Sequence, residues 1–178
     1  EITAEEVERV NRVISELLEF AKTSDLKLVA TDLRKLLEHT VGIVAQEASF
    51  AGVTITTQLD HNLPELLVDP DRITQVILNI LINAIQAMGQ GGQLSVTTHQ
   101  REEEVVVDIS DTGHGISPED QGNMFNPYFT TKKNGTGLGL AIVHKIVEDH
   151  GGSVHIHSTK DTGTQVTVTL PIHPARES

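Results

Sequence analysis

Within the helix-like stretch at residues 71–88, three carboxamide side chains interrupt the apolar run at 76–88. They are Asn79, Asn83 and Gln86, and at about 100° of rotation per residue they fall on one side of a helix. A carboxamide in an apolar helix is costly unless its hydrogen bonds are made, and its oxygen is a hard ligand suited to Mg²⁺. The stripe therefore indicates either a polar tie to a neighbouring loop or a metal-binding edge.

Two glycine-rich segments also have the composition of ligand-binding loops. The run Asp-Thr-Gly-His-Gly-Ile at 111–116 joins a carboxylate, which can accept a hydrogen bond from an amine, to glycines that let the backbone approach a ligand. The run Gly-Thr-Gly-Leu-Gly-Leu at 135–140 leads into an amphipathic helix, whose free N–H groups suit phosphate. Lys132 and Lys133 add positive charge beside it. The run at 135–140 is not a dinucleotide-binding fingerprint, because Leu140 stands where the sixth-place glycine of that fingerprint would stand.

The composition excludes several classes of function. The chain has 178 residues and a formal charge of −12, which argues against nucleic acid or an anionic membrane surface as the main partner. Cysteine is absent, which excludes disulfides and thiolate chemistry and fits a cytosolic compartment. His155 and His157 resemble half a metal site, but two histidines without a third ligand favour surface positions. Because the sequence begins with Glu1, we expect it to be part of a longer protein.

Hydrophobic periodicity predicts the elements that position these residues. Steps of three and four predict helices over 32–51, 70–88 and 137–150, and alternation predicts strands at 53–59, 66–68, 93–99, 104–111, 154–158 and 165–170. Near the N-terminus, two heptads of a coiled-coil seam predict a helix that needs partners from another chain or segment. The seam residues are Val7, Val10, Ile14, Leu17 and Ala21.

Taken in order, these motifs resemble the ATP-binding catalytic domain of sensor histidine kinases, within the superfamily shared with gyrase, the Hsp90 chaperones and MutL. The resemblance covers residues 31–171. It runs from an asparagine box at 79–84 through glycine boxes at 111–115 and 135–140, with a phenylalanine box at 125–129 between them, to Gly163-Thr164. The Thr-Thr-Lys run at 130–132 is similar to that of histidine kinases of the nitrogen-regulator type. The run at 69–72 is similar to that of the zinc-resistance group of these kinases.

The resemblance implies an α+β fold, a two-layer α/β sandwich of the histidine kinase/gyrase/Hsp90 ATPase type. In this fold a mixed, largely antiparallel sheet carries helices on one face, and here a coiled-coil-like helix would precede it. Residues 1–22 would be the second helix of a dimerisation and phosphoacceptor hairpin. A linker at 23–30, a catalytic domain at 31–172 and a tail at 173–178 would follow.

The resemblance also implies ATP and Mg²⁺ as ligands. Asn83 would ligate Mg²⁺ with Asn79 and Gln86 beside it, and Asp111 would accept a hydrogen bond from the adenine amino group. Many relatives carry Lys, His or Arg where Gln86 stands, so a direct cationic contact from this position is not implied. The other implied site residues are Gly113, Gly115, Ile116 and Thr164 near the base, and Lys132, Gly135, Gly137, Leu138, Gly139 and Leu140 near the phosphates.

The implied activity is transfer of the ATP γ-phosphate to a histidine and onward to an Asp of a response regulator receiver domain. The parent protein would be a homodimer through the hairpin, anchored in the inner membrane with this portion in the cytoplasm, and would not bind nucleic acid. None of the nine histidines lies in a His-acid-x-x-x-Pro box, so we expect the phosphoacceptor to precede Glu1.

Two alternatives remain open at this level. An ATP hydrolase of the gyrase, Hsp90 or MutL kind would carry Glu four residues before its magnesium-binding Asn, where this chain has Asn79, which cannot act as a general base. A nucleotide-free dimerisation scaffold would have no need of intact glycine boxes.

Overall fold

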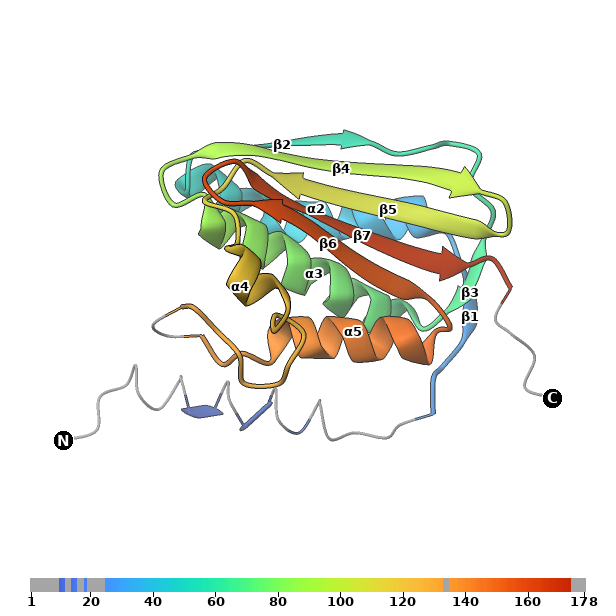
Figure 1. Ribbon diagram of the computed structural model, residues 1–178. Helices are drawn as coiled ribbons and strands as arrows, with labels where there is room; N and C mark the ends of the chain where they lie inside the picture. Colours follow the sequence, from blue (N-terminus) through green and yellow to red (C-terminus); the bar gives the residue numbers. More distant parts are fainter. Residues whose placement is uncertain (1–9, 12–13, 16–17, 19–24, 133–134, 174–178) are drawn as a thin grey trace.

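A five-stranded sheet forms one layer of the molecule and helices form the other (Figure 1). The computed structural model describes residues 10–11, 14–15, 18, 25–132 and 135–173. The sheet consists of β2 (Val53–Gln58), β4 (Gly92–Arg101), β5 (Glu104–Asp111), β6 (Ser153–Thr159) and β7 (Gly163–Pro171). The helices are α2 (Leu33–Phe50), α3 (Pro70–Ala87), the short α4 (Pro118–Gln121) and α5 (Gly139–Asp149). The predicted two-layer sandwich is confirmed.

The strands lie in the order β2-β4-β5-β7-β6. Among the described strands of this sheet, β2 and β4 pair in parallel, because the chain between them crosses over through α3. The other neighbours are antiparallel. The mixed, largely antiparallel sheet is therefore as predicted. Its register brings Asp111 at the end of β5 opposite Thr164 at the start of β7.

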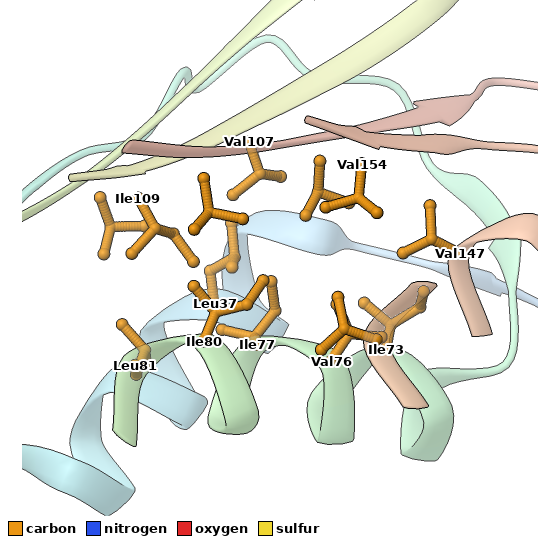
Figure 2. Packing of buried hydrophobic residues seen from close by; sticks show 14 of the residues in the cluster. Leu37, Ile73, Val76, Ile77, Ile80, Leu81, Val107, Ile109, Val147 and Val154 are labelled. Carbon is orange, nitrogen blue, oxygen red and sulfur yellow. The ribbon is translucent and has the colours of Figure 1, made fainter. Parts of the chain in front are cut away.

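The core lies between the helices and one face of the sheet. Helix α3 lies between α2 and α5 (Figure 1). Its apolar stripe, which includes Ile73, Ile77 and Leu81, is almost completely buried. Figure 2 shows this stripe directed toward sheet residues such as Val107 and Ile109. The helical period of the sequence therefore identified the buried face.

The opposite face of the sheet is polar. One row across its strands consists of Thr97, Asp108, Thr167 and His155. His155 and His157 are exposed, as predicted, and the described residues contain no group of three or more His, Cys, Asp or Glu that could hold a metal ion.

Part of the segment that we expected to be a linker forms a short strand. Residues 29–30, which we assigned to the linker, belong to strand β1 (Val29–Thr31). This strand pairs with β3 (Leu66–Val68) in a separate two-stranded antiparallel sheet. The backbone N–H of Lys27 also donates to the Asp69 carboxylate, at 3.0 Å. Three residues are too few to show a strand period, so this pairing depends on a partner far along the chain.

The N-terminal seam is described only in part. The seam residues Val10 and Ile14 are helical and exposed, as is the neighbouring Leu18. Val7, Leu17, Ala21 and the tail at 174–178 lie outside the described residues. Within the described part of the chain, we find no helix with the combined length and hydrophobicity of a membrane span.

Candidate functional site

The carboxamide stripe of α3 holds a cationic group. The Lys132 ammonium donates to Asn83 Oδ1 at 2.8 Å and to Gln86 Oε1 at 2.6 Å. Partial burial of the ammonium group lowers the pKa of Lys132. Two hard oxygens, three residues apart on one helix, therefore converge on a single cation.

Asn79 has a different contact. Its side-chain nitrogen donates to the carbonyl oxygen of Gly139, at 3.3 Å, and so connects α3 to the first residue of α5. The two readings of the stripe thus apply to different residues: Asn79 ties the helix to its neighbour, and Asn83 faces a cation.

The loop before α5 is shaped by its glycines. A Cβ on Gly135 would lie 2.3 Å from the Thr130 hydroxyl oxygen, and that oxygen accepts the backbone N–H of Lys132 at 3.1 Å. Gly137 has φ +71°, and its carbonyl oxygen accepts the N–H of Tyr128 at 2.9 Å. A Cβ on Gly137 would lie 2.4 Å from the carbonyl carbon of Tyr128. A side chain at Gly135 would therefore displace Thr130 and the adjoining Lys132, and one at Gly137 would displace the backbone at Tyr128.

The start of α5 differs from the starts of α2, α3 and α4. The N-cap residues of those helices are Asp32, Asp69 and Ser117, whose side chains each accept a first-turn N–H. The N-cap residue of α5 is Leu138, which is fully buried and has no side-chain acceptor. The N–H groups of Gly139 and Leu140 lie in this first turn, at the positive end of an eleven-residue helix, and such an end suits an anion.

Asp111 lies half-buried at the end of β5. Burial raises the pKa of its carboxyl group, although the backbone N–H groups of Gly113 and Thr164 favour the ionised form. The Gly113 N–H donates to Asp111 Oδ1 at 2.8 Å. A Cβ on Gly113 would lie 2.7 Å from the carbonyl oxygen of Ala87, so glycine lets this loop pack on the end of α3.

A hydroxyl network supports the far side of the same loop. The Ile116 N–H donates to Ser158 Oγ at 2.8 Å, and Ser158 Oγ lies 2.8 Å from Thr164 Oγ1. The Gln121 amide donates to the carbonyl oxygens of both Ile116 and Ser158. The sequence analysis missed Ser158 and Gln121; only the pairing of Ser158 with Thr164 across β6 and β7 would have indicated the first.

Three contacts along α3 bring the separate motifs together. Asn79 meets Gly139, the Asn83 and Gln86 pair meets Lys132, and the carbonyl oxygen of Ala87 accepts the N–H of His114 at 3.2 Å. Segments that are far apart in sequence therefore border one side of this helix. The arrangement combines a half-buried carboxylate, a carboxamide cation site and the N-terminus of a helix. These are complementary to an amine, a cation and an anion, respectively.

Comparison with known proteins agrees with this arrangement. The family described as "Histidine kinase-, DNA gyrase B-, and HSP90-like ATPase" matches residues 68–174. Sensor histidine kinase ZraS of Escherichia coli O157:H7 is 44% identical over 177 residues, which is 99% of this chain and 39% of that protein. The chain thus spans about two fifths of the length of this curated relative.

Two solved structures share the fold. Full-length ShkA in complex with AMPPNP superposes with a TM-score of 0.83 and 25% identity, covering 98% of this chain and 40% of that one. Histidine kinase ThkA in complex with response regulator protein TrrA has a TM-score of 0.83 and 26% identity, covering 97% of this chain and 50% of that one.

Proposed function

Because the chain belongs to the family of histidine kinase-, DNA gyrase B- and HSP90-like ATPases, we propose that it is the ATP-binding catalytic domain of a sensor histidine kinase. The observation that carries the proposal is the contact of Lys132 with Asn83 and Gln86, since it joins the loop before α5 to the asparagine box. ZraS and ThkA are named as histidine kinases, and ShkA, which shares the fold, was solved in complex with AMPPNP.

We assign the adenine to the loop at 111–116. The Asp111 carboxylate would accept a hydrogen bond from the exocyclic amine, and the Thr164 hydroxyl would lie near the ring. Gly113, Gly115 and Ile116 would pass along the base. The hydrogen bonds of Ser158 to Ile116 and Thr164 support this assignment, because they hold both sides of the loop in place before any ligand binds.

We assign the phosphates to the start of α5. The N–H groups of Gly139 and Leu140 would face them, as would that of Leu138 after it releases the Thr136 hydroxyl, to which it donates at 3.3 Å. Gly135 and Gly137 would shape the loop, and Lys132 would add positive charge. A chain with a formal charge of −12 needs such local donors to hold a nucleotide polyphosphate. Helix N–H groups and one lysine supply them without changing the overall charge.

The carboxamide oxygens of α3 fit Mg²⁺, because they already converge on a cationic group and are hard ligands. Asn83 would hold the metal, and Asn79 and Gln86 would flank it. When bound, the ion supplies positive charge to the phosphates. Asn79 cannot act as a general base, and its amide is engaged with Gly139, so the site favours phosphotransfer over hydrolysis of the gyrase kind.

In the parent protein, the γ-phosphate would go to a histidine of a dimerisation hairpin and then to an Asp of a response regulator receiver domain. The parent would be a homodimer anchored in the inner membrane, with residues 1–22 in the hairpin and this portion in the cytoplasm. The nine histidines support an acceptor outside the sequence, since all of them lie between residues 39 and 173 and none in the N-terminal helix.

Calorimetric titration tests the nucleotide assignment. The 178-residue chain is titrated with ADP and with a non-hydrolysable ATP analogue, with and without Mg²⁺. Asp111→Ala should abolish binding of either nucleotide, whereas Asn83→Ala should weaken binding chiefly when Mg²⁺ is present. Asn62→Ala, which changes an exposed loop carboxamide, serves as the control. A folded wild-type chain that binds neither nucleotide would contradict the proposal.

A further inference from the structure

One oxygen of α3 is shared between two roles. Asn83 Oδ1 accepts a hydrogen bond from the Lys132 ammonium at 2.8 Å, and the same oxygen is the one that we assign to Mg²⁺. A metal about 2.1 Å from this oxygen and an ammonium 2.8 Å from it would stand at most about 5 Å apart. Like charges at that distance repel each other even at an exposed site, and both cations use the same oxygen, so binding of one disfavours the other.

Gln86 completes the ammonium site. Its oxygen lies 2.6 Å from the Lys132 nitrogen, a shorter contact than that of Asn83, although the two residues are 46 positions apart in the chain. Gln86 is itself uncharged. The cation beside the asparagine box therefore comes from the loop before α5 and not from α3.

The backbone around Lys132 is positioned for this contact. Its N–H donates to the Thr130 hydroxyl at 3.1 Å, and its carbonyl oxygen accepts the Gly135 N–H, also at 3.1 Å. Gly135 must lack a side chain, because a Cβ at this position would lie 2.3 Å from the Thr130 hydroxyl oxygen. The backbone N–H and carbonyl oxygen of Lys132 are thus both held by hydrogen bonds.

We propose that Gln86 is a positioning residue that holds the Lys132 ammonium at the oxygen of Asn83, so that lysine and Mg²⁺ are alternative occupants of one cation site. The inference rests on the proposed function, because the phosphates of a nucleotide are what either cation would face. Lys132 supports binding of a metal-free nucleotide, and it leaves Asn83 when the metal binds there. The lysine and the metal are therefore negatively coupled.

The test compares ADP affinity with and without Mg²⁺ by calorimetry. ADP is the probe because it lacks the terminal phosphate that a displaced lysine would contact. Without Mg²⁺, Lys132→Met should weaken ADP binding about tenfold, the effect of losing one charge-assisted contact. With Mg²⁺ the loss should stay below about threefold, because the metal supplies the missing charge. Gln86→Met should follow the same pattern with smaller losses.

Two further variants complete the design. Lys35→Met removes the same charge from an exposed side chain on α2 and should change neither affinity. Gln86→Lys added to Lys132→Met should restore metal-free affinity, because it returns a cation to the neighbourhood of Asn83. A merely structural role for Lys132 would not be rescued in this way. Equal losses with and without Mg²⁺, or no rescue, would overturn the inference while leaving the proposed function intact.

A measurement without nucleotide tests the contact directly. The side-chain amide NMR signals of Asn83 and Gln86 should both move in Lys132→Met and remain unchanged in Lys35→Met. If neither signal moves in Lys132→Met, Lys132 does not occupy this site and the inference is wrong. If the wild-type chain binds no ADP in either condition, the proposed function fails, and the alternative-occupant inference fails with it.

Discussion

Replacing Gly115 by alanine should destabilise the domain by about 2–5 kcal/mol. Gly115 has φ +65°, where an alanine costs about 1–2 kcal/mol. Its Cβ would also lie 2.1 Å from the carbonyl oxygen of Thr159, and ordinary contact begins at 3.4 Å. The loop or the β6–β7 turn would have to move by more than about 1 Å, at a further cost of about 1–3 kcal/mol.

For a chain of this size, each kcal/mol corresponds to about 2–4 °C, so the Tm should fall by roughly 5–20 °C. Thermal unfolding followed by circular dichroism measures this directly. Gly42→Ala is the matched control, because Gly42 lies within α2 with no atom within 4 Å of its added Cβ. That change should raise the Tm slightly, since glycine costs about 0.5–1 kcal/mol in a helix. A Gly115→Ala variant that melts within about 2 °C of wild type would refute the packing argument.

Three further substitutions separate stability from binding. Asp111→Asn should keep or raise the Tm at pH 7 while weakening ADP binding. Burial raises the pKa of Asp111, so the folded state binds this proton more tightly than the unfolded state. Ionisation of Asp111 therefore costs stability as the pH rises through the folded pKa. An Asp111→Asn variant with a lower Tm than wild type at pH 7 would contradict this reasoning. His150→Leu should cost about 1–3 kcal/mol, because the buried His150 accepts the Asp69 N–H at 3.0 Å and would leave it unpaired; unchanged urea denaturation would argue against that bond. Asp69→Ala should lower the Tm at pH 7. The difference in Tm between wild type and variant should shrink as the pH falls below 3.8, the ordinary pKa of an Asp carboxyl group. Burial opposes ionisation of Asp69, but the N–H groups of Lys27, Arg72 and Asp71 outweigh it and lower its pKa, so its stabilisation is lost in acid. A difference that is independent of pH would show that the carboxylate charge is not involved.

Local sequence was sufficient for most of the secondary structure. The apolar steps of α3 predicted its buried face because a helix turns through a constant angle, and Asp69-Pro70 marked its start because both residues suit a helix N-terminus. The strands from Gly92 to Asp111 followed from alternation, with a turn at Glu102, which has φ +54°. These signals arise within one turn or one strand and need no distant partner.

The pairing of β1 with β3 had no comparable signal. Val29–Thr31 is too short to show a period, and it becomes a strand because Leu66–Val68 lies beside it. Likewise, the role of Ser158 depends on its position opposite Thr164. Such features depend on register between segments, which is set by the fold as a whole.

The site divides in the same way. Residue types and spacing by themselves identified Asn79, Asn83, Asp111 and the two glycine boxes as candidates, because carboxamides, carboxylates and glycines each have limited chemistry at such positions. Only the tertiary structure decided which of them meet. It joined Asn79 to Gly139 and Lys132 to Asn83 and Gln86, since residues 46 to 60 positions apart become neighbours only when α3 packs against α5 and the loop before it.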